Sequence, residues 1–181
     1  MNIRPLILIA LLVAPAVAHA QSRPSLEQRI ERMESESAIR RILVDYAAYL
    51  DGRDYARYAA LFAPEGEWTG GGDSYKGQAA VRGMLESVLG PAGAPNRSNF
   101  HIISNPQIDI APDGNSARAT SRYLFVMRGP DGRPVPSLAG IYRDEMVRGT
   151  TGWVIQRRVA DDIMPTPEEW RKIIAAQRPA Q

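Results

Sequence analysis

The spacing of apolar residues changes at Asn99, and this change limits the folds open to the chain. Before Asn99, apolar residues recur at intervals of three and four, which indicates helices. From Asn99 to about residue 162 they alternate with polar residues, which indicates strands. Helices followed by a strand meander predict an α+β fold, with a curved antiparallel sheet wrapped on helices.

Three helices are predicted before this change. The first begins in a capping box at Ser25 and Gln28 and ends at Asp51-Gly52, where glycine would take the left-handed conformation usual after a helix. Asp54 caps the second helix, which runs through Phe62 and ends at Pro64. A short strand and a glycine turn follow in "GEWTGGGDSYKG", and "QAAVRGMLESVL" predicts the third helix.

Four strands and a C-terminal helix are predicted after the change. Turn signals separate the strands, which cover roughly residues 99–110, 117–128, 138–148 and 153–162. In the tail, residues 164–181, Thr166 precedes "PEEW", which predicts a short helix with proline in its first position. This tail would either cover a pocket or pack on a neighbouring subunit.

The first twenty residues have the pattern of a secretory signal peptide. Arg4 is followed by an apolar run and then by Ala-His-Ala, a small-x-small cleavage pattern. We therefore expect cleavage before Gln21, a periplasmic or secreted protein, and no association with the membrane after removal of the signal. Residues 21–181 suffice for one domain, and the absence of cysteine excludes disulfides, thiol catalysis and cysteine-based zinc sites.

Composition and motifs argue against several classes of function. The 22 basic and 20 acidic residues are scattered, whereas a nucleic-acid footprint would gather basic residues in a patch. Residues Asp144-Glu145 and Asp161-Asp162 are adjacent on predicted strands, so each pair points to opposite faces and cannot converge on a metal. Neither a phosphate-binding P-loop nor a G-x-S-x-G nucleophile elbow is present. We expect neither a metal nor a cofactor.

His101 is the only histidine after the predicted signal peptide, and it lies in the alternating stretch "SNFHIISNPQIDI". Its strand face also carries Ile103 and Asn105, so it is partly polar. The residue could be a packed strand histidine or a base that points into a pocket. Asp51, at the end of the first helix, is likewise either a helix-terminating residue or the carboxylate partner of such a base.

Four stretches resemble the SnoaL-like branch of the NTF2-like superfamily. They are "AIRRILVDYAAYLDGRDYARYAALFAPEGEW", "YKGQAAVRGML", "NFHIISNPQID" and "GIYRDEMVRGTTGWVIQRRV". The resemblance as a whole extends over about residues 34–163. The resemblance implies three N-terminal helices packed on a strongly curved antiparallel sheet, forming a cone-shaped α+β barrel with a deep pocket. Residues 21–33 would then begin the first helix ahead of this domain.

Within this branch the chain is most similar to the lyases that include scytalone dehydratase and hexachlorocyclohexane dehydrochlorinase. Those enzymes pair an Asp after the first helix with a His on the first long strand, and Asp51 and His101 match these positions. The resemblance further implies a catalytic Arg158, five residues after Trp153. Without it, Arg158 could equally be a solvated neighbour of Arg157, since alternation turns only one of the two inward.

The same resemblance matches Tyr46 and Trp68 to pocket-lining positions. Tyr123 is a further candidate hydroxyl partner for a polar substrate, and Asn105 is a candidate on the face of the predicted base.

These residues predict a cofactor-independent lyase, a dehydratase or related β-elimination enzyme, acting on a small cyclic or aromatic molecule. Asp51 would fix the tautomer of His101, and the free ring nitrogen would remove a proton. An isomerase or cyclase using the same pocket, and a non-catalytic small-molecule-binding or interaction domain, remain alternatives. We also expect a homo-oligomer, a trimer or a dimer, because a sheet face and the tail need cover.

Overall fold

The computed structural model describes residues 23–177. The predicted signal peptide lies outside this range. No helix of residues 23–177 is long and apolar enough to cross a membrane. The elements, in chain order, are α1 (Leu26–Asp51), α2 (Tyr55–Ala60), β1 (Phe62–Gly70), β2 (Asp73–Lys76), α3 (Gln78–Leu89), β3 (Asn99–Ile110), β4 (Ser116–Arg128), β5 (Pro134–Gly149), β6 (Gly152–Met164) and α4 (Pro167–Gln177).

The six strands form one curved sheet in the order β2-β1-β6-β5-β4-β3. Neighbouring strands from β6 to β3 are antiparallel, as expected from their turns, but β1 and β6 are parallel. The sheet is therefore mixed, and the prediction of a purely antiparallel sheet is wrong. It is also open, because β2 and β3 are its two edges, so the strands do not close into a barrel.

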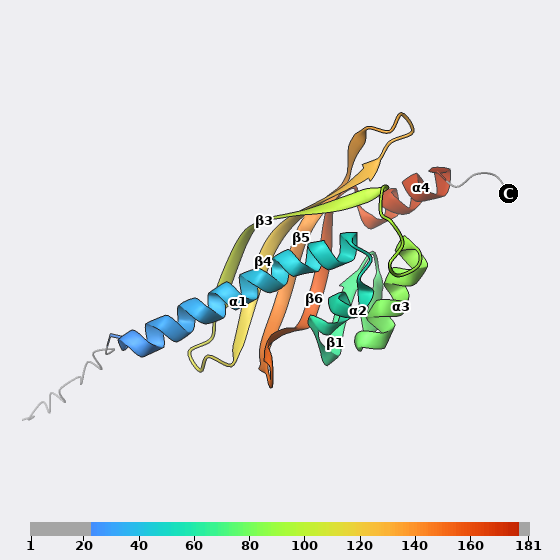
Figure 1. The fold of residues 1–181 in the computed structure, drawn as a ribbon. Coiled ribbons are helices and arrows are strands. Elements are labelled where there is room, and N and C mark those ends of the chain that lie inside the picture. Colours follow the sequence, from blue (N-terminus) through green and yellow to red (C-terminus); the bar gives the residue numbers. More distant parts are fainter. Residues whose placement is uncertain (1–22, 178–181) are drawn as a thin grey trace, which may run out of the picture.

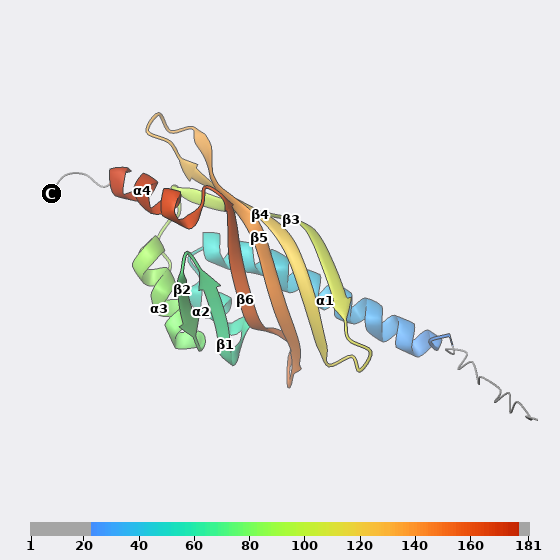
Figure 2. The same ribbon diagram turned by 180° about the vertical axis from the view of Figure 1, so that it is seen from behind.

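The first three helices lie on one face of the sheet, as Figures 1 and 2 show from opposite sides. α1 crosses the strands, and its N-terminal part extends beyond them (Figure 1). A fourth helix, α4, follows β6 and lies at the same end of the molecule as α3 (Figure 2). The fold implied by the resemblance has three helices, and α4 is the additional C-terminal helix, which begins at Pro167 as the tail pattern predicts and contributes to the site.

α1 begins as its sequence predicts, but only its second half is buried, since Leu26, Ile30 and Met33 are exposed, and it ends differently. At its start the Gln28 N–H donates to the Ser25 hydroxyl at 3.2 Å, and the Ser25 N–H donates to the Gln28 side chain at 2.9 Å. At its end Gly52 keeps right-handed helical angles, and Arg53 instead takes the left-handed conformation with φ of 58°. The prediction of a left-handed Gly52 is therefore wrong by one residue.

The second helix is shorter than its apolar pattern predicts. It ends at Ala60, and both Phe62 and Pro64 belong to β1. The Ile155 N–H donates to the Leu61 carbonyl at 2.8 Å, so backbone pairing with β6 replaces the next helical turn. Pro64 lies where the β1–β6 register shifts, a place in a strand where a missing N–H is tolerated.

The core lies between α1–α3 and the concave side of the sheet. It is rich in tyrosine as well as aliphatic residues, and its most buried large members are Ile39, Tyr46, Tyr55, Tyr58, Phe62, Val81, Met146 and Ile155. Tyr46 packs on Tyr58, and Tyr58 on Phe62, with ring centroids 4.6 and 5.8 Å apart. Tyr46 and Tyr58 of this aromatic layer also line a cavity.

Candidate active site

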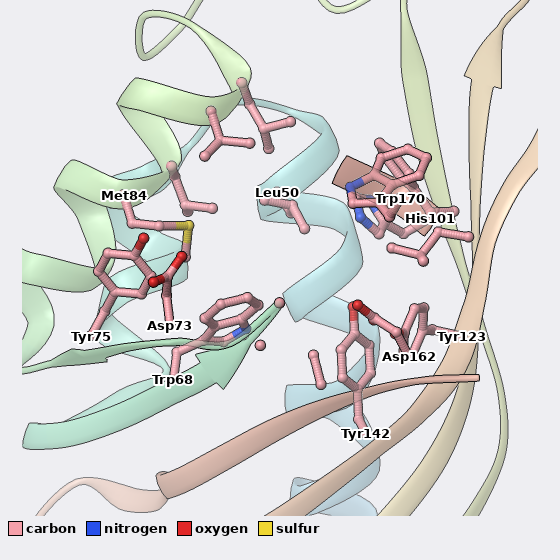
Figure 3. A pocket seen from close by; sticks show the side chains of 18 of the residues that line it. Leu50, Trp68, Asp73, Tyr75, Met84, His101, Tyr123, Tyr142, Asp162 and Trp170 are labelled. Atoms are coloured by element: carbon pink, nitrogen blue, oxygen red, sulfur yellow. The ribbon is translucent and has the colours of Figure 1, made fainter. Parts of the chain in front are cut away.

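A cavity of about 560 Å³ lies between the helices and the sheet. Every helix and strand from α1 to α4 contributes at least one residue to its wall, which is largely aromatic and aliphatic. Figure 3 shows Trp68, Tyr75 and Met84 on one side, and His101, Tyr123 and Asp162 on the other. A volume between about 300 and 1,000 Å³ with a few polar groups is typical of small-molecule sites.

Asp51 and His101, fifty residues apart in sequence, are joined by two hydrogen bonds. The His101 ring Nδ1 lies 2.7 Å from Asp51 Oδ1, and the His101 backbone N–H donates to Asp51 Oδ2 at 2.8 Å. Because a carboxylate only accepts, this contact places the proton of the neutral ring on Nδ1 and leaves Nε2 as the acceptor. His101 lines the cavity, and its side chain is 10% exposed.

The end of α1 is fastened to the start of β3 by a polar cluster that sequence reasoning missed. The buried Arg53 guanidinium donates to Asn99 Oδ1 at 2.6 Å and to the Leu50 carbonyl at 3.2 Å. The Asn96 amide donates to the Asp51 carbonyl at 2.9 Å and to the Asn99 carbonyl at 2.7 Å. These bonds fix the two backbone segments that carry Asp51 and His101. The positive φ of Arg53 is a feature that no local pattern in the sequence signals.

Three of the residues predicted to bind substrate lie on the cavity wall. Tyr46, Trp68 and Tyr123 all line it, and the Trp68 Nε1–H donates to the Tyr46 hydroxyl at 3.0 Å. The Tyr123 ring stacks on Tyr142, with centroids 4.2 Å apart and an interplanar angle of 22°. Burial raises the pKa of Tyr123 above its ordinary value, so its hydroxyl remains a proton-bearing donor.

Asn105, the fourth of these residues, lies outside the cavity lining. It is exposed and has φ of 50°, in the part of β3 where the register with β4 shifts between Ser104 and Gln107. This irregularity breaks the strict alternation on which the prediction depended, because an extra residue in a strand reverses the faces beyond it. The prediction that Asn105 shares the cavity face with His101 is therefore wrong.

Arg158 points inward, as predicted, but lies beneath the cavity wall rather than on it. Its side chain is 1% exposed, and it donates from Nε and Nη2 to the two oxygens of Asp144 at 2.6 and 2.7 Å. The Tyr46 and Tyr142 rings lie 3.8 and 4.5 Å from its Cζ atom. Burial alone would lower the pKa of Arg158, but the Asp144 carboxylate more than offsets this and raises it above its ordinary value.

Asp162 is a cavity residue that sequence reasoning missed. It is half-buried, it lines the cavity and it accepts a hydrogen bond from the Tyr123 hydroxyl. Burial raises the pKa of its carboxyl group, although the Tyr123 hydrogen bond opposes this shift. Strand alternation could have separated Asp162 from Asp161, but no pattern in the sequence indicates which of the two faces the cavity.

The last helix covers part of the cavity mouth. Trp170 and Arg171 of α4 both line the cavity, and the Trp170 ring meets Phe125 edge-on with centroids 6.3 Å apart. The Arg171 side chain donates to the Gly71 carbonyl at 3.4 Å, which links α4 to the β1–β2 turn. The tail was predicted either to cover a pocket or to pack on a neighbouring subunit, and in this structure α4 lies on the pocket.

Residues 23–177 contain no group of three or more His, Asp or Glu side chains placed to hold a metal ion. The cavity wall offers proton transfer by His101 and Asp162, hydrogen bonding by tyrosine hydroxyls, and apolar contact with a ring, and Asp73 and Arg171 add one charged group of each sign.

Several solved structures share the fold of this chain. An NTF2-like protein with a cystatin-like fold from Novosphingobium aromaticivorans is 19% identical, with a TM-score of 0.70 over 82% of this chain and 94% of its own. A proposed scytalone dehydratase from the same organism is 28% identical, with a TM-score of 0.64 over 75% and 89%. A hexachlorocyclohexane dehydrochlorinase is 19% identical, with a TM-score of 0.63 over 74% and 88%.

No curated protein sequence shows significant similarity to the chain. The solved structures establish the NTF2-like α+β fold, and they include a proposed dehydratase and a dehydrochlorinase. The sequence profile of the SnoaL-like domain matches residues 31–159, which is most of the chain, and the chain therefore belongs to the SnoaL-like domain family.

Proposed function

We propose that the protein is a cofactor-independent lyase that eliminates water or a related leaving group from a small cyclic or aromatic molecule. The observation that carries this proposal is the 2.7 Å contact between Asp51 Oδ1 and His101 Nδ1 at the wall of an aromatic cavity. The likeness to a proposed scytalone dehydratase, at 28% identity, supports the same class of reaction.

His101 would act as the general base. With Asp51 holding Nδ1–H, Nε2 accepts the proton of a substrate carbon, and the Asp51 carboxylate stabilises the imidazolium that forms. An imidazole is too weak a base for an unactivated C–H bond, so the substrate must carry an adjacent group such as a carbonyl that delocalises the carbanion. General-base catalysis of this kind contributes about 10² to 10⁴-fold to a rate.

The largely aromatic and aliphatic cavity wall favours a ring-shaped substrate with apolar surface. Tyr46, Trp68, Phe125 and Trp170 present aromatic surface, and Leu50 and Met84 add aliphatic surface. Burying such surface against a ring is favourable by about 25 cal/mol for each Å² of apolar area removed from water. We infer that cyclic β-hydroxyketones are the simplest substrate class that meets both the chemical and the steric requirement.

Arg158 has a different proposed role from the anion stabiliser that family resemblance implied. Because Asp144 occupies two of its nitrogens and no part of it lines the cavity, we assign it to positioning. Its guanidinium supports the faces of Tyr46 and Tyr142 and so fixes the cavity floor.

The proposal is tested by following proton abstraction separately from elimination. The full chain and its His101→Gln variant are incubated in D₂O with 3-hydroxycyclohexanone and related cyclic β-hydroxyketones, and deuterium incorporation and product mass are read by mass spectrometry. We expect the wild type to accelerate both exchange and loss of water, and the variant to lose both by about 10²-fold or more. Equal rates for the two proteins would refute His101 as the base.

Product mass also separates the alternatives. An isomerase or cyclase would exchange the same proton without the loss of 18 mass units that accompanies dehydration. A protein that binds these ketones but accelerates neither reaction would be a binding domain.

A further inference from the structure

The side chains of Tyr123 and Asp162 meet across an intervening strand. Tyr123 of β4 pairs with Gly140 of β5, and Gly140 pairs with Asp162 of β6, so the three residues form one row across the sheet. A Cβ atom on Gly140 would overlap the Tyr123 hydroxyl and the Asp161 carbonyl oxygen. The tyrosine therefore reaches Asp162 only because residue 140 has no side chain, and its hydroxyl donates to the Asp162 carboxylate.

The two adjacent carboxyl groups at this point of β6 lie in different surroundings. Asp161 is exposed and pairs with Arg143 at 3.2 Å, whereas Asp162 is half-buried and lines the cavity. Tyr123 is held in place from its other side by stacking on Tyr142 at 4.2 Å. One carboxyl group is thus directed into the cavity by a fixed tyrosine, on the same side as His101 (Figure 3).

We propose that Asp162 and Tyr123 form the subsite for the leaving hydroxyl group of the substrate, with Asp162 as its proton donor. This inference rests on the proposed lyase function and adds the acid that a dehydration requires beside the base. Hydroxide is a poor leaving group, and a positioned acid that protonates the departing oxygen lowers the barrier. Asp51 is engaged with His101, and Asp144 is buried in its pair with Arg158. Asp73 also lines the cavity, but it lies beside Trp68 and Tyr75, on the side away from His101 (Figure 3).

Two cavity residues, His101 and Asp162, supply the proton transfers of the elimination step. His101 Nε2 takes the proton from the substrate carbon, and the electron pair of that C–H bond becomes the new C=C bond. The C–O bond breaks, and the oxygen keeps its electron pair, takes the proton of Asp162 and departs as water. His101 is then protonated and Asp162 ionised; loss of a proton from His101 to solvent and uptake of one by Asp162 restore both groups.

The surroundings of Asp162 shift the pKa of its carboxyl group upward, which is the direction that a proton donor needs. Burial raises the pKa of its carboxyl group, the neighbouring Asp161 raises it further, and the hydrogen bond from Tyr123 on β4 opposes these effects. Tyr142 of β5, Arg143 of β5, Arg171 of α4 and His101 of β3 are the other titratable or charged groups nearby on packed elements. The hydrogen bond from Tyr123 therefore helps to set the pKa of the proposed donor, Asp162.

The first experiment separates the acid from the base. Wild type, Asp162→Asn and the matched control Asp161→Asn are incubated with 3-hydroxycyclohexanone in D₂O, with folding checked by circular dichroism. We expect Asp162→Asn to keep exchange within about threefold but to lose dehydration by about 10²-fold or more. Asp161→Asn should keep both. Retention of dehydration by Asp162→Asn, or equal loss of exchange and dehydration, would overturn the donor assignment.

The pH profile supplies a readout that a structural role would not change. Dehydration by the wild type should fall on the alkaline side as Asp162 ionises. Tyr123→Phe removes the hydrogen bond that holds the pKa of Asp162 down, so this fall should move to higher pH. A profile unchanged by Tyr123→Phe would contradict the proposed coupling.

A binding experiment decides the subsite without catalysis. Phenol and toluene have similar shapes and differ in one hydroxyl group, and their dissociation constants are measured by NMR titration for wild type and Asp162→Leu. We expect phenol to bind the variant about tenfold more weakly, the effect of about one hydrogen bond, while toluene binds as well or better. If the wild type catalyses neither exchange nor dehydration, the lyase function fails while this comparison still decides the subsite. Parallel changes for phenol and toluene would overturn it.

Discussion

Asp51 holds His101 by both of its carboxylate oxygens, one on the ring Nδ1 at 2.7 Å and the other on the backbone N–H at 2.8 Å. The backbone bond fixes the distance between α1 and β3, and the ring bond fixes the orientation of the imidazole. A substitution that keeps one bond and changes the other can therefore separate the fold from the chemistry.

Asp51→Asn should leave the protein folded but prevent His101 from acting as the base. An asparagine keeps the size of the side chain but can present an N–H to Nδ1, which favours the tautomer with the proton on Nε2. We expect proton exchange to fall by about 10² to 10⁴-fold. ¹⁵N NMR of the imidazole reads the tautomer directly. Asp54→Asn is the matched control, because Asp54 caps α2 and an asparagine caps a helix equally well.

Removing one partner of the Asp144–Arg158 pair should destabilise the protein strongly, whereas replacing both partners with apolar residues should change its stability little. Asp144→Ala leaves an unpaired buried guanidinium, which we expect to lower the free energy of unfolding by about 3–5 kcal/mol. The double variant Asp144→Leu, Arg158→Met should recover most of this loss. Urea denaturation measures both. Asp161→Ala, which breaks the exposed pair with Arg143, should cost at most about 1 kcal/mol, and a similar cost at the two sites would contradict the burial argument.

Gly140→Ala and Gly83→Ala should change stability in opposite directions. A methyl group at Gly140 overlaps Tyr123 and the backbone of β6, so we expect a loss of about 1–3 kcal/mol and a displaced tyrosine. Gly83 lies within α3 with no atom within 4 Å of an added Cβ, so alanine should stabilise the helix by about 0.5–1 kcal/mol. Thermal unfolding of both variants tests the pair, and a neutral Gly140→Ala would show that the row has room to adjust.

Asp162 should make the protein less stable as the pH rises. Its folded pKa lies above the unfolded value of about 4, so the folded state binds the extra proton between these two values. Its stability contribution is complete below the unfolded pKa and is lost as the pH rises through the folded one. We expect Asp162→Asn to remove this part of the pH dependence of urea denaturation and Asp161→Asn to retain it. Identical pH profiles for wild type and Asp162→Asn would contradict the raised pKa.

Trp170→Ala should open the cavity mouth without unfolding the core. Trp170 lies on α4 and contacts Phe125 at the cavity wall. Its loss removes aromatic surface from one side of a bound ring, so we expect toluene to bind about tenfold more weakly while the unfolding midpoint stays nearly constant. NMR titration provides the dissociation constant. Unchanged toluene binding would show that α4 lies outside the functional cavity.

Most helices and strands, and two of the polar groups at the site, could be predicted from the amino-acid sequence. The change of period at Asn99 located the boundary between helices and the main strands, and the cap at Ser25 located the start of α1, because such signals are local. The family resemblance brought Asp51 and His101 together as a pair, and the fold places them in contact.

Features that depend on strand order, register and burial depth could be seen only in the folded protein. The parallel pairing of β1 with β6 ended α2 early, and the register shift in β3 turned Asn105 away from the cavity. The register of three strands brought Tyr123 over Gly140 to Asp162, and the packing of two tyrosines enclosed Arg158. Hydrophobic spacing reports which face of an element is buried, but it carries no information on which distant side chains meet there, because that depends on how whole elements pack.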